Sequence, residues 1–172
     1  MKDFMRYFFV LIVTLFLANI SNAQIDVNIN LGSQPVWGPT GYDYVEYYYL
    51  PDIEAYYNVP QQRYYYYEKG NWIYKSSLPS RYSNYDFYNS YKVVINEREP
   101  WRNHKNYKKK YYSYKGRHDQ QLIRDSRESK YYVIKDHPEH NNWTKEQNDK
   151  KSNQNNKNND KQGKHDSGKN KK

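Results

Sequence analysis

The sequence predicts a mainly β protein, in which a small antiparallel meander sheet with one short helix or helical turn is followed by a disordered basic tail. Turn-forming residues recur at steps of 9, 10 and 9 residues, a spacing typical of a meander with one strand between successive turns. They are Pro51-Asp52, Pro60, Lys69-Gly70 and Pro79. Tyrosine, which favours strands, is concentrated in the same region, because 16 of the 23 tyrosines lie between Tyr42 and Tyr91.

The segment before the meander predicts a strand and then a turn-rich connection. Apolar and polar residues alternate strictly from 25 to 31, as in a half-buried strand. Residues 32–41 contain three glycines and two prolines, which are typical of turns. Trp37 lies in this connection and can pack from it.

The turns delimit four candidate strands, at residues 44–50, 54–59, 63–68 and 71–77. The last two form the most clearly indicated hairpin, because Gly70 can adopt the positive φ that a short hairpin loop requires.

The region after the meander predicts less regular structure. Tyrosines at every third position from Tyr82 to Tyr91 are compatible with a short helix or with a loop that contains one helical turn. Three further elements are expected, namely a strand at 92–95, a weak helix at 119–128 and a strand at 131–134.

By composition the chain divides into four regions. Residues 1–23 are expected to be a signal peptide, because Lys2 and Arg6 precede an apolar run and a small-residue cleavage site at 21–23. The alternative is an uncleaved anchor, although the run is short for a membrane span; no transmembrane segment is expected after cleavage. The other regions are a tyrosine-rich β domain at 24–100, a basic, weakly structured linker at 101–140 and a disordered Asn/Lys-rich tail at 141–172.

Charge and cysteine content limit the classes of function. Residues 42–100 carry 6 basic and 8 acidic side chains, a net charge of −2, whereas residues 101–172 carry 20 and 9, a net charge of +11. A cationic arm of this kind attracts polyanions through a salt-sensitive, non-specific interaction. The chain has no cysteine, which excludes disulfides, thiol catalysis and thiolate metal sites.

The tyrosine runs at 47–49 and 64–67 place tyrosine on both faces of a strand, because side chains alternate. In one interpretation tyrosine replaces the aliphatic core that a small disulfide-free sheet lacks. In the other, the outer rings form a platform for sugar rings, peptide chains or another sheet. The candidate ligand-binding residues are Tyr47, Tyr49, Tyr65, Tyr67, Trp72 and Tyr74.

A second candidate surface is the stretch 105–117, in which lysine and tyrosine are interleaved. This composition is typical of single-strand nucleic-acid binders, but an exported protein meets envelope polyanions and anionic lipids instead. The partners expected are therefore an envelope polyanion or glycan, with peripheral membrane contact and no genomic nucleic acid; a charge run kept only for solubility is the alternative. The candidate polyanion-binding residues are Lys105, Lys108, Lys109, Lys110, Lys115 and Arg117.

Nothing in the sequence indicates catalytic residues, a metal site or a cofactor. A nucleophilic-serine signature is absent, and all five histidines lie beyond the tyrosine-rich region, where a rigid catalytic geometry is least expected. The segment 137–140 (HPEH) is a weak metal signal without a further ligand. Asp52 and Glu54 lie on a turn, where no cleft is expected around them.

One resemblance rests on five short segments, namely 48–53 (YYLPDI), 70–72 (GNW), 78–82 (LPSRY), 84–86 (NYD) and 91–95 (YKVVI). On these segments residues 24–95 resemble small secreted bacterial proteins without assigned function. The resemblance implies export and a compact tyrosine-rich module, and it implies no catalytic residues.

The function expected first is that of a non-catalytic envelope protein of a Gram-negative-type bacterium, periplasmic or at the cell surface. It would act structurally or adhesively through an aromatic sheet and a cationic tail. The alternative is a specific binding module for a glycan or cell-wall polymer, and a hydrolase is a distant third.

Overall fold

The structure is a computed structural model that describes residues 30–166, with the backbone alone beyond residue 153. The predicted signal peptide, residues 1–23, lies outside the described residues, as does most of the strand predicted at 25–31. Leu31, the last residue of that predicted strand, is buried in a 3₁₀ turn, η1 (Leu31–Ser33).

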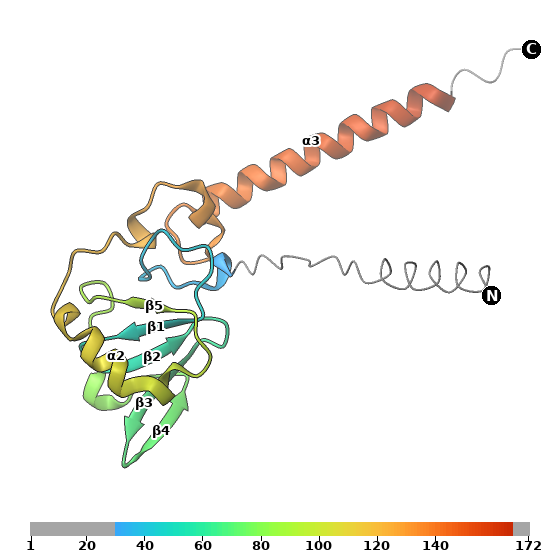
Figure 1. The fold of residues 1–172 in the computed structure, drawn as a ribbon. Helices are drawn as coiled ribbons and strands as arrows, with labels where there is room; N and C mark the ends of the chain where they lie inside the picture. Colours follow the sequence, from blue (N-terminus) through green and yellow to red (C-terminus); the bar gives the residue numbers. More distant parts are fainter. Residues whose placement is uncertain (1–29, 167–172) are drawn as a thin grey trace, which may run out of the picture.

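Five antiparallel strands form one sheet in the order β4-β3-β2-β1-β5 (Figure 1). The strands are β1 (Tyr47–Leu50), β2 (Ala55–Asn58), β3 (Arg63–Glu68), β4 (Asn71–Lys75) and β5 (Val93–Ile95). The first four follow one another as a meander, and β5 returns to pair with β1 at the opposite edge. The predicted mainly β fold is confirmed, and each strand lies within the range expected for it.

The β3–β4 hairpin closes through the two residues that the sequence indicates. Lys69 and Gly70 have φ angles of 49° and 83°, and Glu68 pairs with Asn71. Two successive positive φ angles are the geometry of a type I′ turn, whose twist matches that of the flanking strands. The positive φ predicted for Gly70 is confirmed.

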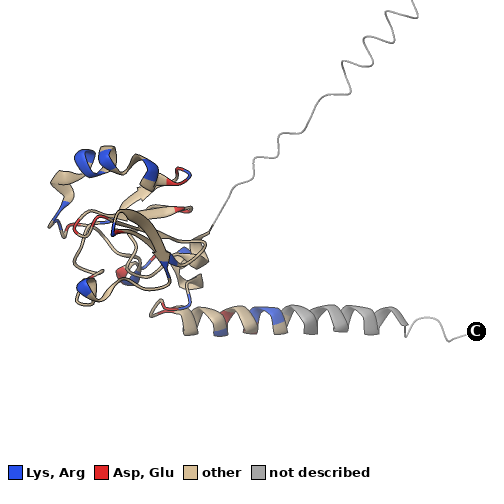
Figure 2. Cartoon of the chain, turned by 90° about the horizontal axis from the view of Figure 1, so that it is seen from below, with Lys and Arg blue, Asp and Glu red and all other residues tan. Residues whose placement is uncertain are grey.

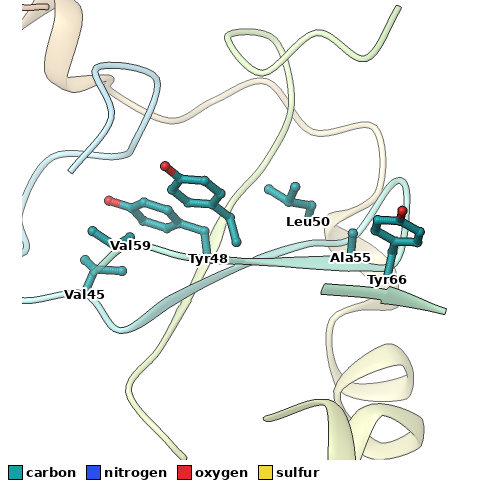
Figure 3. Packing of buried hydrophobic residues seen from close by; sticks show 7 residues of the cluster. Val45, Tyr48, Leu50, Ala55, Val59 and Tyr66 are labelled. Atoms are coloured by element: carbon teal, nitrogen blue, oxygen red, sulfur yellow. The ribbon is translucent and has the colours of Figure 1, made fainter. Parts of the chain in front are cut away.

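Both faces of the sheet are covered by other parts of the chain. Successive residues of β1 point to opposite faces, yet Tyr48 and Tyr49 expose only 0% and 1% of their surfaces. Figure 3 shows the core of the first face, where Tyr48 and Tyr66 pack with Leu50 and other small aliphatic residues. Tyrosine therefore supplies much of the core on both sides, because the consecutive tyrosines of β1 and β2 point alternately to the two faces.

The first face is closed by the connection that precedes the sheet. Trp37 packs against Tyr57 and Phe87, with ring centroids 5.1 and 4.9 Å away, so the packing expected of this tryptophan is confirmed. The hydroxyl of Tyr48 donates a hydrogen bond to Oε1 of Gln34 at 3.0 Å. Both groups are buried, so the bond satisfies two polar atoms that cannot reach water.

The loop between β4 and β5 contains one 3₁₀ turn, η2 (Ser80–Tyr82), and no α-helix. The loop with one helical turn, one of the two predicted alternatives, is therefore confirmed. At its end Lys92 is buried, and its ammonium group donates to the carbonyl oxygens of Phe87 and Ser90 at 2.6 and 2.7 Å. Desolvation lowers the pKa of Lys92 to about 8.

Tyr85, in the same loop, has a buried hydroxyl without a hydrogen-bond partner among the described residues. We expect Tyr85→Phe to raise the free energy of unfolding by about 1 kcal/mol, because an unsatisfied buried hydroxyl is removed and no bond is lost. Tyr48→Phe is the matched control and should lower the free energy of unfolding by a similar amount, since it leaves the buried Oε1 of Gln34 without a donor. Urea unfolding of both variants measures the two effects. Equal changes in the free energy of unfolding would show that the Tyr85 hydroxyl is not unsatisfied.

Residues 100–117, which we call the strap, lie across the second face of the sheet, where composition predicts the start of a weakly structured linker at 101–140. The strap contains η3 (Pro100–Asn103), α2 (His104–Lys110) and η4 (Tyr112–Tyr114). Tyr107 of α2 is buried with Tyr49 and Tyr56 in the core of this face. The strap is ordered because its aromatic residues are buried while its lysines remain at the surface.

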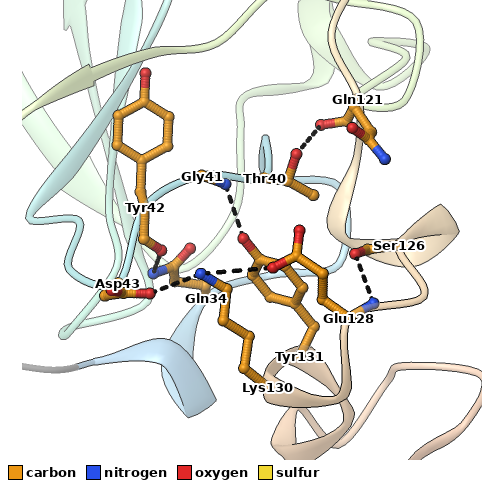
Figure 4. Close-up of polar contacts among 10 residues, drawn as sticks. All are labelled: Gln34, Thr40, Gly41, Tyr42, Asp43, Gln121, Ser126, Glu128, Lys130 and Tyr131. Carbon is orange, nitrogen blue, oxygen red and sulfur yellow. Dashed lines mark hydrogen bonds and ion pairs between the residues drawn. The ribbon is translucent and has the colours of Figure 1, made fainter.

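Residues 118–137 are also packed, against the connection at 30–43. Ile123 and Tyr131 are fully buried with Leu31 and Val36 in a third small core. Figure 4 shows the polar contacts that join the two segments, among them the N–H of Gly41 to the Tyr131 hydroxyl at 2.7 Å.

Two sequence predictions for this segment are wrong. The weak helix expected at 119–128 is only a 3₁₀ turn, η5 (Ile123–Asp125). Where a strand is expected at 131–134, the chain forms a second 3₁₀ turn, η6 (Ser129–Val133). Tyr131 and Ile134 are the buried pair, and residues three apart share a face in a 3₁₀ helix and not in a strand.

The last element is a long helix, α3 (His140–Asp166), where the composition predicts a disordered tail. Its first turn is attached to η6, since His140 Nδ1 lies 2.8 Å from the carbonyl oxygen of Tyr132. Further on it projects away from the sheet (Figure 1) and satisfies its backbone groups within its own turns. No helix within residues 30–166 is long and apolar enough to cross a membrane.

Candidate functional site

The six predicted ligand-binding residues all belong to the second face of the sheet, but they differ in exposure. Tyr47 and Tyr49 are buried at 5% and 1% exposure, because the strap covers β1 and β2. Tyr67 and Tyr74 are exposed at 55% and 58%. Tyr65 and Trp72 are partly buried. The expected exposed ladder is therefore limited to the β3–β4 hairpin, and Tyr49 is a core residue.

A hollow of about 540 Å³, which we call the aromatic pocket, lies beside this hairpin. Five of its lining residues are aromatic, namely Tyr47, Tyr65, Trp72, Tyr74 and Trp101. Four are polar, namely Glu46, Gln61, Arg98 and Glu99. Four predicted ligand residues therefore meet here, with Trp101 of the strap added to them.

The rings of the aromatic pocket are held in a fixed stack. Tyr65 stacks on Trp101, with ring centroids 4.1 Å apart and planes inclined by 10°. The ring of Tyr74 also stacks with that of Tyr65, at a centroid distance of 5.7 Å. The hydroxyl of Tyr65 donates to Oε1 of Gln61 at 3.1 Å. The guanidinium of Arg63 lies 5.5 Å from the centre of the Tyr74 ring, a favourable cation–π distance.

A second hollow of about 430 Å³, which we call the basic pocket, lies beside the first turns of α2. It is lined by Ile53, Glu54, Tyr66, Tyr67, Trp72, Arg81, Tyr82, His104, Lys105 and Lys108. Trp72 lines both hollows, so the two pockets adjoin at this side chain.

Glu54 connects the sheet to the strap. Its carboxylate forms ion pairs of 2.8 Å with both Lys108 and Lys115. Partial burial acts to raise the pKa of Glu54, but the two ammonium groups outweigh it and hold the pKa below its ordinary value. The residue has a φ of 53°, in the left-handed region that strains a side chain with a Cβ, and its position here fixes the carboxylate under the strap.

His104 is a site residue that the sequence interpretation missed, because it placed all five histidines outside any rigid structure. Its Nδ1 lies 3.0 Å from the Tyr56 hydroxyl, and its ring meets Trp72 edge-on with centroids 4.9 Å apart. Desolvation lowers its pKa despite Glu54, whose carboxylate is 3.8 Å from Nε2. The spacing of His104, Tyr107 and Tyr111 is that of one helix face. This spacing could have indicated that His104 lies on the same side of a helix as two aromatic residues.

The six predicted polyanion-binding residues do not form a free arm. Lys105 lines the basic pocket, and Lys108 and Lys115 are paired with Glu54. Arg117 is paired with Asp119. Lys109 and Lys110 are exposed on α2, and the helix accordingly carries much of the positive charge in Figure 2.

No group of three or more His, Cys, Asp or Glu residues within the part of the chain that the structure describes could hold a metal ion. The candidate site is therefore built from aromatic rings, ammonium groups and hydrogen-bonding side chains. Comparison with protein-family models, curated proteins and solved structures finds no match for this chain.

Proposed function

We propose that this protein is a non-catalytic exported binding protein that holds a glycan chain in the aromatic pocket. The observation that carries the proposal is the combination of five aromatic residues with amide, carboxylate and guanidinium groups around one open hollow. A sugar ring has an apolar C–H face and a polar edge of hydroxyls. The aromatic surfaces can bury the face while the polar groups bind the hydroxyls, as in other ligand pockets.

The carboxylates of the aromatic pocket are suited to binding. Glu46 accepts hydrogen bonds from the Tyr44 hydroxyl and from the Asn58 amide. Glu99 is paired with Arg102 at 2.8 Å. Carboxylates fixed in this way can orient sugar hydroxyls as hydrogen-bond acceptors, and this supports a binding role in preference to acid–base catalysis.

The proposed location, the periplasm or the cell surface, rests on the predicted signal peptide. An exported protein meets cell-wall and surface polysaccharides in either place. An adhesive role through the whole aromatic sheet, the function expected first from sequence, is less well supported, because the strap covers Tyr49 and its neighbours.

Replacing an exposed aromatic residue of the pocket should reduce glycan binding. We expect Tyr74→Ala to weaken the affinity for a bound glycan about tenfold or more, because an aromatic contact at the centre of a site commonly contributes over 1 kcal/mol. The measurement is calorimetric titration with neutral oligosaccharides of glucose, of N-acetylglucosamine and of xylose. Tyr112→Ala is the matched control, since Tyr112 is 68% exposed and lines neither pocket.

Two results would contradict the proposal. One is that no neutral or acidic glycan binds the full chain, and the other is that Tyr74→Ala binds as tightly as the wild type. Binding that disappears at high salt and depends equally on all exposed lysines would instead favour non-specific adhesion to polyanions.

A further inference from the structure

We infer that the basic pocket is a subsite for an acidic group on the glycan, so that the ligand is an acidic polysaccharide. The inference rests on the proposed function and goes beyond it, because it assigns the charge of the ligand and the residues that recognise it. The acidic group is a carboxylate, a sulfate or a phosphate carried on a sugar ring.

Trp72 places the two pockets on one path. It lines the aromatic pocket together with Tyr74 and the basic pocket together with Tyr67, and its ring lies 5.5 Å from that of Tyr67. A chain that crosses Trp72 therefore contacts both hollows. One sugar unit would stack among the rings, and a neighbouring unit would enter the basic pocket.

The basic pocket has an excess of positive charge. Lys105 and Lys108 line it, and Lys115 binds the same carboxylate as Lys108. Glu54 is the one carboxylate among the lining residues, against the ammonium groups of Lys105 and Lys108 and the guanidinium of Arg81. Within residues 30–153 Lys105 forms no ion pair, and its ammonium group is free for a ligand.

Arg81, in the loop that follows β4, also lines the pocket and is its third cation. Arg81 pairs with Glu68 at 2.8 Å and lies over the ring of Tyr82 at 4.8 Å. Its side chain nevertheless remains 42% exposed, and a guanidinium held in this way can bind an oxyanion with its remaining N–H groups. Cations from the strap and from the loop after β4, together with the aromatic rings of the same lining, suit a sugar ring that carries an acidic substituent.

A polynucleotide is a poorer match for this arrangement. Nucleic-acid grooves present cations along an extended track with several rings for successive bases. Here the cations converge on one hollow, and the adjoining hollow has two carboxylates in its lining, Glu46 and Glu99, which would repel a second phosphate. The pattern therefore favours an isolated acidic group next to a neutral polar unit.

The test compares three oligosaccharides of matched length: a neutral glucan, a galacturonate chain and a sulfated glucan. We expect the wild-type chain to bind one or both acidic oligosaccharides about tenfold more tightly than the neutral one at moderate salt. Lys105→Gln should lose most of this preference, because the acidic chains bind more weakly to the variant. Lys109→Gln, an exposed lysine of the same helix outside both pockets, is the control and should retain the preference.

The outcomes separate the inference from the proposed function. Equal affinity for neutral and acidic chains, with Tyr74→Ala still impaired, would overturn the acidic subsite and leave glycan binding in place. Equal losses in Lys105→Gln and Lys109→Gln would overturn it as well, because the charge effect would then be non-specific. Acidic binding that requires Lys105 but not Tyr74 would support the basic pocket and reject the aromatic pocket. The two acidic chains distinguish a carboxylate ligand from a sulfate.

Discussion

As the pH rises above 10, the protein is expected to unfold cooperatively within about one pH unit. The cause is the burial of tyrosine hydroxyls, since desolvation raises the pKa of five tyrosines well above the ordinary value of 10.0. These residues are Tyr48, Tyr49, Tyr56, Tyr64 and Tyr85. In the unfolded chain the same hydroxyls lose their protons near pH 10, so the folded state binds more protons and stability falls as the pH rises.

The size of the effect is large for a small domain. One pH unit above 10, each buried tyrosine has lost about 1.4 kcal/mol of stabilisation, and five together have lost about 7 kcal/mol. A domain of this kind has a total stability of about 5–15 kcal/mol. The loss lies within that range one pH unit above 10 and roughly doubles over the next unit, so the ionisation of the buried tyrosines unfolds the domain at a pH of about 11 to 12.

Lys92 acts in the opposite direction at lower pH. Desolvation lowers its pKa to about 8 from 10.5, so between these values the unfolded chain holds the additional proton and folding becomes more favourable as the pH rises. We therefore expect the stability to increase slightly above pH 8 before it falls steeply above 10.

Circular dichroism and tyrosinate absorbance, followed together as the pH is raised, measure this transition. The part of the absorbance change that comes from the buried tyrosines should coincide with the loss of circular dichroism, because the buried hydroxyls ionise only on unfolding. Tyr85→Phe should shift the midpoint to higher pH, whereas Tyr112→Phe should not, since Tyr112 is exposed. Gradual ionisation of all tyrosines while the circular dichroism stays unchanged would refute the explanation.

The second large effect is expected from Glu54→Gln, which removes the charge that holds the strap on the sheet. Both Lys108 and Lys115 lose their partner, so we expect the free energy of unfolding to fall by about 1–3 kcal/mol. We also expect trypsin to cleave the strap at least about tenfold faster, because local opening becomes more frequent.

Acid should reproduce the effect of this substitution. The pKa of Glu54 is lowered in the folded state, so its contribution is complete above the unfolded pKa of about 4.5 and is lost as the pH falls through the lower folded value. Unfolding in urea at neutral and acidic pH measures this, and wild type and Glu54→Gln should converge in acid.

Glu128→Gln is the control for both measurements. Glu128 pairs with Lys130 at 3.7 Å on the surface, with 60% of its side chain exposed, and such pairs contribute little to stability. If Glu54→Gln and Glu128→Gln resist trypsin equally well, Glu54 does not hold the strap.

The sequence was sufficient to predict the sheet, because the turn-forming residues and the strand-favouring tyrosines indicate the same strands. Gly70 provides the positive φ of the hairpin turn, and the evenly spaced turns delimit every strand of the meander. The sequence also indicated four of the five aromatic residues that line the aromatic pocket. It could not show that Tyr49 is covered, because its cover comes from a segment more than fifty residues later.

The strap and the third core were missed for a related reason. Lysines dominate the composition around Tyr107 and Tyr111 and obscure the helix face that these residues share. Ile123 and Tyr131 have few apolar neighbours in sequence, and their partners, Leu31 and Val36, are distant along the chain. Packing contacts between residues so far apart leave no pattern in the local sequence. The composition of residues 101–140 alone therefore indicates a weakly structured linker.

The distance between these partners along the chain has a consequence for how the protein folds. Tyr48 of β1 pairs with Val94 of β5, and the N–H of Ile123 donates a hydrogen bond to the carbonyl oxygen of Gly38. Contacts this remote form late, since a long loop must close before any of them is gained. A chain that ends at Pro100 would have every strand of the sheet but no strap over its second face, and its exposed tyrosines would promote aggregation. We therefore expect the native contacts to be complete only once the segment through Ile134 is present.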